Sequence, residues 1–326
     1  MDNEKSFKKK FKLFDMNRDG KGVYEVETRK PTLKFFFVLL WRKFSQLLQL
    51  NLMMLLKIIP ILTVLGLYLL GTKTPTVTEA IYVPISGITK IIHAPSLTAA
   101  LDLSSIQMEL PVLSPWMNVL IIVLTLFLAL TWGWQSVGST YVLRGLFRGD
   151  AVFVFSDYFH AIKKNFKQAF LLGLLDFLFT AVLILDFIFF YYRTGVSFGM
   201  DLMYFAVFAM GIIYLVMRFY LYHLLITFEL SNFKIIKNAL IFSILGIKRN
   251  IMALIGFVVF LAFHIVLIIL LLPIGISIPL VLPFVYILAL FGFISTYAAY
   301  PIIDRYMIQP YETTATITNQ NQDQQD

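Results

Sequence analysis

Six long apolar segments limit what this chain can fold into more than any other feature of its sequence. A helix needs about 20 apolar residues to cross a hydrocarbon core about 30 Å thick. Six segments meet this requirement, at residues 47–71, 116–137, 169–191, 202–226, 251–272 and 280–301. Charged residues make up only 14% of the 326, whereas soluble domains carry about 25%. The sequence therefore predicts an all-α integral membrane protein with about six transmembrane helices, and it excludes the folds of soluble enzymes.

Basic residues are concentrated on one side of the predicted spans. That side holds the N-terminal leader, the loops after the second and fourth spans and the C-terminal tail, whereas the opposite side holds only Lys73, Lys90 and Arg193. Because Lys and Arg are enriched in cytoplasmic loops, we expect both termini in the cytoplasm. Trp116 and Trp132 lie near the two ends of the second span, as expected at two membrane interfaces. The absence of cysteine excludes disulfides and fits the plasma membrane of a bacterium.

The predicted organisation has three parts. Residues 1–34 form a basic cytoplasmic leader, residues 35–305 form the six-span membrane domain, and residues 306–326 form a disordered polar tail. Directly after the leader, residues 34–48 mix Phe, Leu and Trp with Lys and Arg, which is typical of an amphipathic interfacial helix.

Three segments between the spans are large enough to form surfaces. An external segment lies at residues 72–115, and two basic cytoplasmic elbows lie at residues 141–168 and 232–250. The elbows share a sequence echo, since Ala161-Ile-Lys-Lys-Asn-Phe166 is similar to Gly246-Ile-Lys-Arg-Asn-Ile251. Either both are basic stop signals, or the chain duplicates a unit of helix plus span that presents two elbows to a partner.

Motifs of enzymes and cofactor sites are absent from the sequence. There is no G-x-x-x-x-G-K-[ST] nucleotide loop and no G-x-S-x-G nucleophile motif, and the four histidines lack the spacing of metal ligands. We interpret His223 and His264 as hydrogen-bonded helix residues. We therefore expect neither catalysis nor a cofactor. The basic residues lie beside the spans, which favours contacts with anionic lipid over nucleic acid.

One motif in the leader matches the first half of a calcium-binding loop. It reads Asp15-Met-Asn17-Arg-Asp19-Gly20, but Val26 occupies the twelfth position, where the loop needs a bidentate Glu. A turn accounts for Asp, Asn and Gly equally well. We therefore predict a turn here and no metal site.

Apart from Asp186, which we expect near the outer surface, three charged residues lie inside the predicted spans: Lys57, Asp176 and Arg218. A charge within the bilayer is unfavourable and marks a candidate functional site. At about 1.5 Å per residue, all three fall in the inner third of the membrane, so they can meet. We predict an Asp176–Arg218 pair with Lys57 nearby. The cluster either forms a polar path or gate, or it fixes helix packing while Lys57 extends toward the interface.

The stretch from Gly138 to Gln168 carries a set of local motifs. They are Tyr141-Val-Leu-Arg144, Arg148, Ser156-Asp157-Tyr158-Phe159 and Lys163-Lys164-Asn165-Phe166-Lys167-Gln168. These motifs resemble those of the YesL family of bacterial polytopic membrane proteins, a family defined as a domain of unknown function. The resemblance extends over the six-span body, while the Gln135–Ser139 stretch and the long external segment depart from the family pattern.

The resemblance implies a role in carbohydrate uptake, since family members are typically encoded beside carbohydrate transporters. The sequence lacks the E-A-A-x-x-x-G loop of sugar permeases, so we expect an accessory subunit and not the permease. The first hypothesis is a non-enzymatic accessory subunit of a carbohydrate ABC import system that contacts the permease and its binding protein. Its candidate docking residues are Tyr141, Arg144, Arg148, Asp157, Lys163, Lys164, Asn165, Lys167 and Gln168.

The alternative hypothesis is an independent small transporter or channel. It requires Lys57, Asp176 and Arg218 to line a water-filled cavity. Transporters often build such sites from discontinuous helices. This hypothesis therefore expects prolines to break the spans around the site, at Pro60, Pro273, Pro279 and Pro283.

Overall fold

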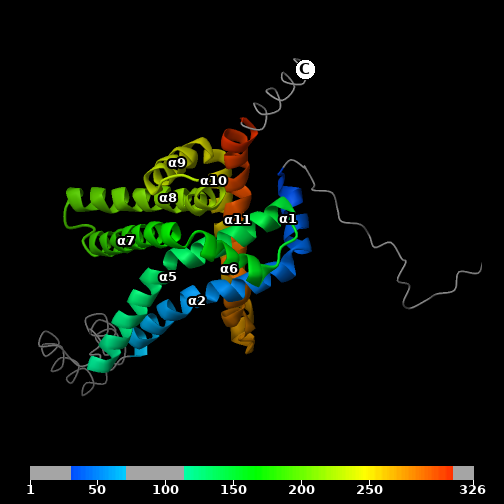
Figure 1. The fold of residues 1–326 in the computed structure, drawn as a ribbon. Coiled ribbons are helices and arrows are strands. Elements are labelled where there is room, and N and C mark those ends of the chain that lie inside the picture. Colours follow the sequence, from blue (N-terminus) through cyan, green and yellow to red (C-terminus); the bar gives the residue numbers. More distant parts are fainter. Residues whose placement is uncertain (1–30, 71–113, 311–326) are drawn as a thin grey trace, which may run out of the picture.

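The computed structural model describes residues 31–70 and 114–310, which are helical apart from short connections (Figure 1). No β-strand occurs within these ranges. Most of the predicted leader, the external segment and the polar tail lie outside the described residues, and so does the calcium-like motif. The last helical stretch continues through residue 310, so the polar tail begins later than the predicted residue 306.

Within residues 31–70 and 114–310, six helices are long and apolar enough to cross a membrane. These spans are α2 (Phe44–Leu70), α5 (Pro115–Arg148), α7 (Phe166–Tyr191), α8 (Phe198–Thr227), α10 (Ile247–Leu271) and α11 (Ile278–Ile303). The shorter helices are α1 (Leu33–Arg42), α6 (Val154–Lys164), α9 (Asn232–Leu245), the 3₁₀ turn η2 (Leu272–Ile274) and the π-helical turn η3 (Asp304–Ile308). The predicted class, an all-α multi-pass membrane protein, is confirmed. The cytoplasmic location of both termini stays a prediction.

The helices repeat one arrangement three times along the described chain. Each unit has a short helix, a single residue that interrupts the helix, a first span and a second span: α1–α2–α5, α6–α7–α8 and α9–α10–α11. The two spans of each unit contact each other, and α2–α5, α7–α8 and α11 run in different directions in Figure 1. The residues before the first spans are Lys43, Asn165 and Gly246. Their φ of −111° to −86° and ψ of 11° to 21° leave the helical region and interrupt the helix.

The sequence echo between the two elbows does not mark corresponding positions of this repeat. In the first elbow the interruption at Asn165 follows the Lys-Lys pair of the motif. In the second elbow the interruption at Gly246 precedes the Lys-Arg pair. The unit of helix plus span therefore exists in three copies, but the shared letters fall on opposite sides of the interruption.

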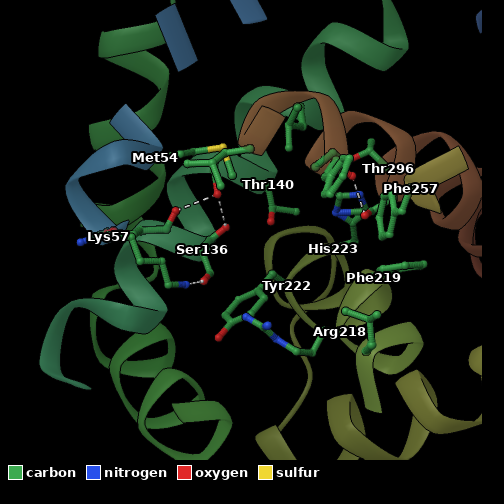
Figure 2. A pocket seen from close by; sticks show the side chains of 18 of the residues that line it. Met54, Lys57, Ser136, Thr140, Arg218, Phe219, Tyr222, His223, Phe257 and Thr296 are labelled. Carbon is green, nitrogen blue, oxygen red and sulfur yellow. Dashed lines mark hydrogen bonds between the residues drawn. The ribbon is translucent and has the colours of Figure 1, made fainter. Parts of the chain in front are cut away.

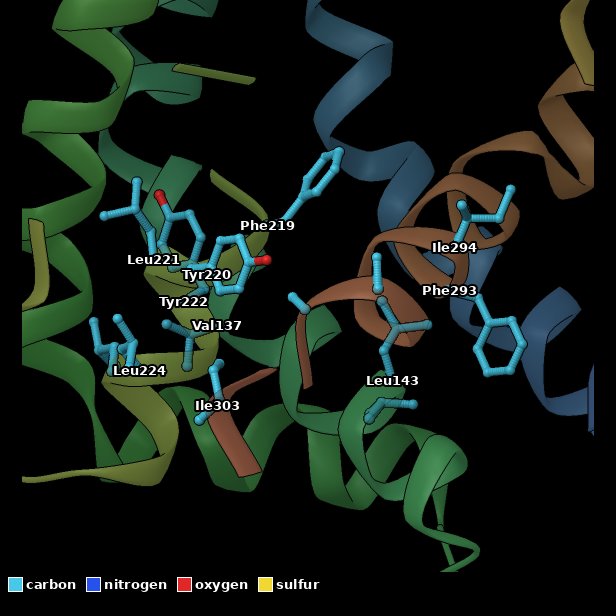
Figure 3. Packing of buried hydrophobic residues seen from close by; sticks show 14 of the residues in the cluster. Val137, Leu143, Phe219, Tyr220, Leu221, Tyr222, Leu224, Phe293, Ile294 and Ile303 are labelled. Carbon is cyan, nitrogen blue, oxygen red and sulfur yellow. The ribbon is translucent and has the colours of Figure 1, made fainter. Parts of the chain in front are cut away.

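The second span of each unit forms the core of the molecule. Most buried apolar side chains come from α5, α8 and α11, and they include Val137, Leu143, Tyr220, Leu224, Phe293 and Ile303 (Figure 3). These positions gather toward the C-terminal ends of the three helices, so the units meet there. The first spans α7 and α10 expose long runs of Leu, Ile and Phe. Such an outer surface suits lipid, whose tails are as apolar as these side chains.

Prolines inside the spans do not break the helices. Pro60 lies within the continuous helix α2, and Pro283 and Pro301 lie within α11. Pro273 falls in the turn η2, and Pro279 falls in the first turn of α11. The expectation that prolines create discontinuous spans is therefore wrong.

Side chains from α10 satisfy the carbonyls that prolines of α11 leave without a donor. A proline has no N–H, so the carbonyl four residues earlier loses its helical hydrogen bond. For Pro283 this is the carbonyl of Pro279, and it accepts a hydrogen bond from His264 Nε2 over 2.7 Å. For Pro301 this is the carbonyl of Tyr297, and it accepts a hydrogen bond from Arg249 Nη1 over 3.2 Å. An unpaired carbonyl in lipid is strongly unfavourable, so these contacts keep α11 intact.

Asn51 links the first span of the chain to the last. Its Nδ2 donates to the carbonyl of Phe284 over 2.6 Å, and its Oδ1 accepts from the N–H of Ala289 over 3.0 Å. The residue is 1% exposed, so it is enclosed between α2 and α11. A buried amide with both ends paired specifies the register of the two helices.

Candidate functional site

Asp176 of α7 is the centre of a buried polar cluster between α5, α7 and α8, and it is 3% exposed. Its Oδ2 accepts hydrogen bonds from Trp132 Nε1 over 2.7 Å and from the Tyr222 hydroxyl over 2.6 Å. Its Oδ1 accepts one from the Tyr214 hydroxyl over 2.6 Å. Arg218 Nε lies 3.0 Å from Oδ1, as a charge contact without the alignment of a hydrogen bond. Trp132 Nε1 and the Arg218 guanidinium can only donate, so these neighbours stabilise the ionised form of the carboxylate.

A close crossing of α5 and α7 places Trp132 against Asp176. Gly133 and Gly173 meet at this crossing, and a Cβ on either glycine would overlap backbone atoms of the other helix. Small residues allow membrane helices to approach this closely. Gly133 follows Trp132 directly, and Gly173 lies about one helical turn before Asp176, so the crossing sets the geometry of the cluster.

Lys57 of α2 reaches the same cluster through Trp132. Its Nζ lies 3.5 Å from the centroid of the Trp132 ring, a cation–π contact, and donates to Ser136 Oγ over 2.9 Å. No carboxylate of the described residues lies within ion-pair distance of Nζ. The structure therefore brings Lys57, Asp176 and Arg218 together, with an aromatic ring in place of a carboxylate next to Lys57.

A cavity of about 300 Å³ lies beside the cluster, between α2, α5, α8 and α11 (Figure 2). Figure 2 shows Lys57 on one side and His223 on the opposite side, with Arg218 between them. The polar residues that line the cavity are Lys57, Gln135, Ser136, Ser139, Thr140, Arg218, Tyr222, His223, Ser295 and Thr296. No Asp or Glu is among the described residues of this lining, so the ionised groups of the wall are cationic.

His223 of α8 faces this cavity without a hydrogen-bond partner. The residue is 2% exposed, and neither ring nitrogen bonds to any residue that the structure describes. The prediction that His223 is hydrogen-bonded is therefore wrong, whereas His264 does bond, to Pro279 and Tyr286. A buried unpaired polar group costs about 1–3 kcal/mol, so His223 favours an occupied cavity.

Four residues of the predicted docking elbow hold the fold together. Arg144 Nη1 donates to Thr227 Oγ1 over 2.9 Å at the C-terminal end of α8. Asp157 accepts from the backbone N–H just before α6, and Asn165 donates back to the last turn of α6. Gln168 Nε2 donates over 2.6 Å to a carbonyl in the loop after α8. These contacts satisfy helix ends and a loop, which explains the residue types without a partner.

The other five elbow residues differ in exposure. Tyr141 is half-buried and packs against the core. The charged residues Arg148, Lys163, Lys164 and Lys167 are exposed. The elbow therefore offers a positively charged surface at the end of α6 and the start of α7.

The helix α6 has one buried side and one exposed aromatic side. Tyr158 is 2% exposed and packs its ring against Gly138 of α5, where a Cβ would overlap the ring. Burial raises the pKa of the Tyr158 hydroxyl. Phe155 and Phe159 are about half exposed, and Phe153, at the N-terminal end of the helix, is more exposed still. The exposed side is therefore apolar enough to contact a lipid interface or a partner protein.

The aromatic donors of the cluster were missed by sequence reasoning. The sequence predicts Trp132 at a membrane interface, but it is buried within α5, which continues to Arg148 beyond the predicted end of the second span at residue 137. Tyr214 and Tyr222 do carry a signal in the sequence. With Arg218 they recur at intervals of four, which places all three on one side of α8.

A comparison with known protein families finds a match in the part of the chain that contains the polar cluster. Residues 115–187 match one family model, described as protein of unknown function, DUF624. The match covers α5, α6 and most of α7, and so contains both Trp132 and Asp176. It supports the predicted resemblance to an uncharacterised family, while the YesL name and the link to carbohydrate uptake stay predictions. No curated protein and no solved structure matches the chain.

Proposed function

We propose that this protein moves a polar solute across the membrane through the cavity between α2, α5, α8 and α11. The observation that carries the proposal is the lining of the cavity. Two cations, Lys57 and Arg218, and several hydroxyl groups face an open volume of about 300 Å³ between membrane-spanning helices. Ionisable groups within a bilayer typically line substrate paths or water-filled cavities. A cluster that only held helices together would need no such volume.

The polar cluster divides into a structural half and a solute-facing half. Asp176 is engaged by four side chains and does not line the cavity, so it supports the packing of α5, α7 and α8. Lys57 and Arg218 are attached to this support and line the cavity. The two interpretations that the sequence leaves open, a gate and a packing pair, therefore apply to different residues of one cluster.

We further propose an N-in/C-in orientation in a bacterial plasma membrane. The uneven distribution of Lys and Arg along the sequence supports this orientation. The cavity then lies in the cytoplasmic half of the membrane, because it is built from the C-terminal parts of α5, α8 and α11. We propose no catalytic step, so the solute is bound and released unchanged.

The absence of cysteine from the sequence allows a direct test, because one introduced thiol is then the only one present. Thr140→Cys lies in the cavity wall, and Leu185→Cys lies on the exposed outer side of α7 as the matched control. A membrane-impermeant methanethiosulfonate should modify Thr140→Cys from either side of oriented vesicles. It should leave Leu185→Cys unmodified, since a thiol in lipid does not ionise.

Two outcomes would count against this function. If Thr140→Cys resists the reagent from both sides, the cavity is not a path for solutes. If it reacts from one side only, passage across the membrane is contradicted and the accessory role gains support.

A second candidate function is an accessory subunit of a carbohydrate ABC import system that contacts the permease and its binding protein. The observation that favours it is the exposed aromatic side of α6, with Phe155 and Phe159, beside the exposed Lys163 and Lys164. Aromatic residues are enriched at protein interfaces, and a positive rim steers an acidic partner surface. Anionic lipid is the other proposed partner of this surface.

Affinity isolation of the tagged full chain from mild-detergent membranes tests the accessory role. A sugar permease should be recovered in stoichiometric amount, and Phe155→Ala with Phe159→Ala should abolish its recovery. Phe198→Ala is the control. Phe198 is also aromatic and is 83% exposed, but it is the first residue of α8 and does not belong to α6. Recovery of the chain alone across several detergents would contradict the accessory role.

A further inference from the structure

We infer that the cavity binds an anion that also carries hydroxyl groups, with its carboxylate, phosphate or sulfate oxygens between Lys57, Arg218 and His223. The inference rests on the proposed function, because it names the class of solute for the same cavity. It follows from three observations: the charge balance of the cluster, the unused donors of the cavity wall, and the orientation of the wall hydroxyls.

The charges around the cavity do not balance. Lys57 and Arg218 line it, and Asp176 is the carboxylate that pairs with one of them. Both oxygens of Asp176 also accept hydrogen bonds from aromatic side chains outside the cavity or at its edge. When Lys57 is protonated, its charge has no carboxylate partner among the described residues, which is strongly unfavourable in a site of low dielectric. An anion in the cavity supplies the missing charge.

The unused donors of the wall match the oxygens of an anion. Arg218 contacts Asp176 through Nε, and neither Nη group has a partner among the described residues. Lys57 donates to Ser136 over 2.9 Å and to the Trp132 carbonyl over 3.5 Å, which leaves one of its three N–H groups. A guanidinium presents paired N–H groups that fit two oxygens of a carboxylate or phosphate.

His223 supplies a further donor on the opposite side of the cavity (Figure 2). Its two ring nitrogens are buried and unpaired within the described residues. A neutral imidazole carries one N–H, which needs an acceptor, and the part of the cavity wall that the structure describes contains no carboxylate to provide it. A cationic solute would leave this N–H unpaired and would be repelled by Lys57 and Arg218.

The hydroxyl groups of the wall act as acceptors, because their protons are already used. Ser139, Ser295 and Thr296 donate to helical carbonyls four residues earlier, over 2.7 to 2.9 Å. Their lone pairs remain available at the cavity wall. These acceptors pair with hydroxyl donors, so a hydroxylated anion satisfies the wall better than a bare inorganic one.

The test uses the full chain with Thr140→Cys, reconstituted in phosphatidylcholine vesicles. It measures the rate at which neutral 2-hydroxyethyl methanethiosulfonate modifies the thiol. Gluconate and sorbitol are the probes, since they share a hydroxylated carbon chain and differ by one carboxylate. Gluconate should slow modification about tenfold at roughly ten times its Kd, as occupancy dictates, and sorbitol should not.

Charge variants show whether the cavity cations cause the protection. Lys57→Gln removes a cavity charge that has no carboxylate partner, and Lys163→Gln removes an exposed charge of α6 as the matched control. Lys57→Gln should weaken protection by gluconate about tenfold or more, and Lys163→Gln should leave it unchanged. Arg218→Lys, which keeps the charge but loses the forked donors, serves as a second variant if Lys57→Gln does not fold.

Each outcome separates the inference from the proposed function. Equal protection by gluconate and sorbitol would overturn the anion and leave the solute cavity standing. Protection by neither probe in phosphatidylcholine would also overturn the anion, unless added phosphatidylglycerol protects the thiol. That last result would support an anion from a lipid headgroup, whereas protection by gluconate alone would support a soluble one. A thiol that never reacts would remove both proposals.

Discussion

The indole N–H of Trp132 donates to Asp176 Oδ2 over 2.7 Å, at the point where α5 and α7 touch. The ammonium of Lys57 lies 3.5 Å from the centroid of the same ring. One aromatic side chain therefore separates the buried carboxylate of Asp176 from the ammonium of the half-buried Lys57, so the two groups form no direct ion pair. This arrangement leaves the ammonium at the cavity wall.

Trp132→Phe should lower the free energy of unfolding by about 1.5–3 kcal/mol, because it removes a hydrogen bond to an ionised carboxylate. Trp116→Phe is the control, since Trp116 lies in the same helix and is 83% exposed. It should leave stability unchanged. Denaturant unfolding of both variants in one detergent provides the comparison, and equal losses would contradict a special role for the buried indole.

Asp176→Asn and Arg218→Gln should each destabilise the protein by about 3–5 kcal/mol, because each removes one partner of an ion pair whose carboxylate is buried. The double variant should lose less than the sum. Arg148 and Asp150 form the control pair, with atoms 3.5 Å apart and side chains about half exposed. Their coupling should be about 0–1 kcal/mol. Simple additivity of the Asp176 and Arg218 losses in a double-mutant cycle would exclude the pair as a source of stability.

The six spans and the charged members of the cluster could be predicted from the sequence. Length and apolarity decide whether a helix crosses a membrane, and Lys57, Asp176 and Arg218 stand out against apolar neighbours. The aromatic partners of these charged residues could not be predicted from the sequence in the same way. Trp and Tyr occur both at membrane interfaces and in buried hydrogen-bonded positions, and only the crossing of α5 and α7 assigns Trp132 to the second class.

The end of α5 shows why part of the site was misplaced. The predicted second span ends at residue 137, among the polar residues Gln135, Ser136, Ser139 and Thr140. In the structure these residues are helical and line the cavity. Polarity at the end of an apolar run indicates either a loop or a wall that faces a cavity. The local sequence does not distinguish the two, because the difference lies in helices that are distant along the chain.

Gly133→Ala and Gly173→Ala should sharply reduce the yield of folded protein. A Cβ at either site overlaps backbone atoms, which can move only if α5 separates from α7. Gly211→Ala is the control, because a Cβ there meets nothing within 4 Å, and it should be neutral or stabilising by up to about 1 kcal/mol. Size-exclusion profiles of detergent extracts report the yield. A Gly133→Ala variant with normal yield and stability would disprove the close crossing.

His264→Leu should destabilise the protein by about 1–3 kcal/mol, because the Pro279 carbonyl loses its donor. Adding Pro283→Ala should restore most of this loss, since alanine supplies the N–H that α11 lacks at that position. Pro60→Ala is the control, because it lies in α2 and should not rescue His264→Leu. Unfolding midpoints of the single and double variants measure the rescue. If Pro283→Ala rescues no better than Pro60→Ala, His264 does not act through this carbonyl.

Synthesis proceeds from α2 to α11, and Asn51 meets Phe284 and Ala289 only after the last hairpin has entered the membrane. Until then its amide lacks the two partners that it has in the folded protein. During the insertion of the later spans, α2 therefore lacks these contacts with α11. The register of α2 against α11 is set only when α11 arrives. A chain that stops before α11 would present this unpaired amide to the quality-control proteases of the membrane.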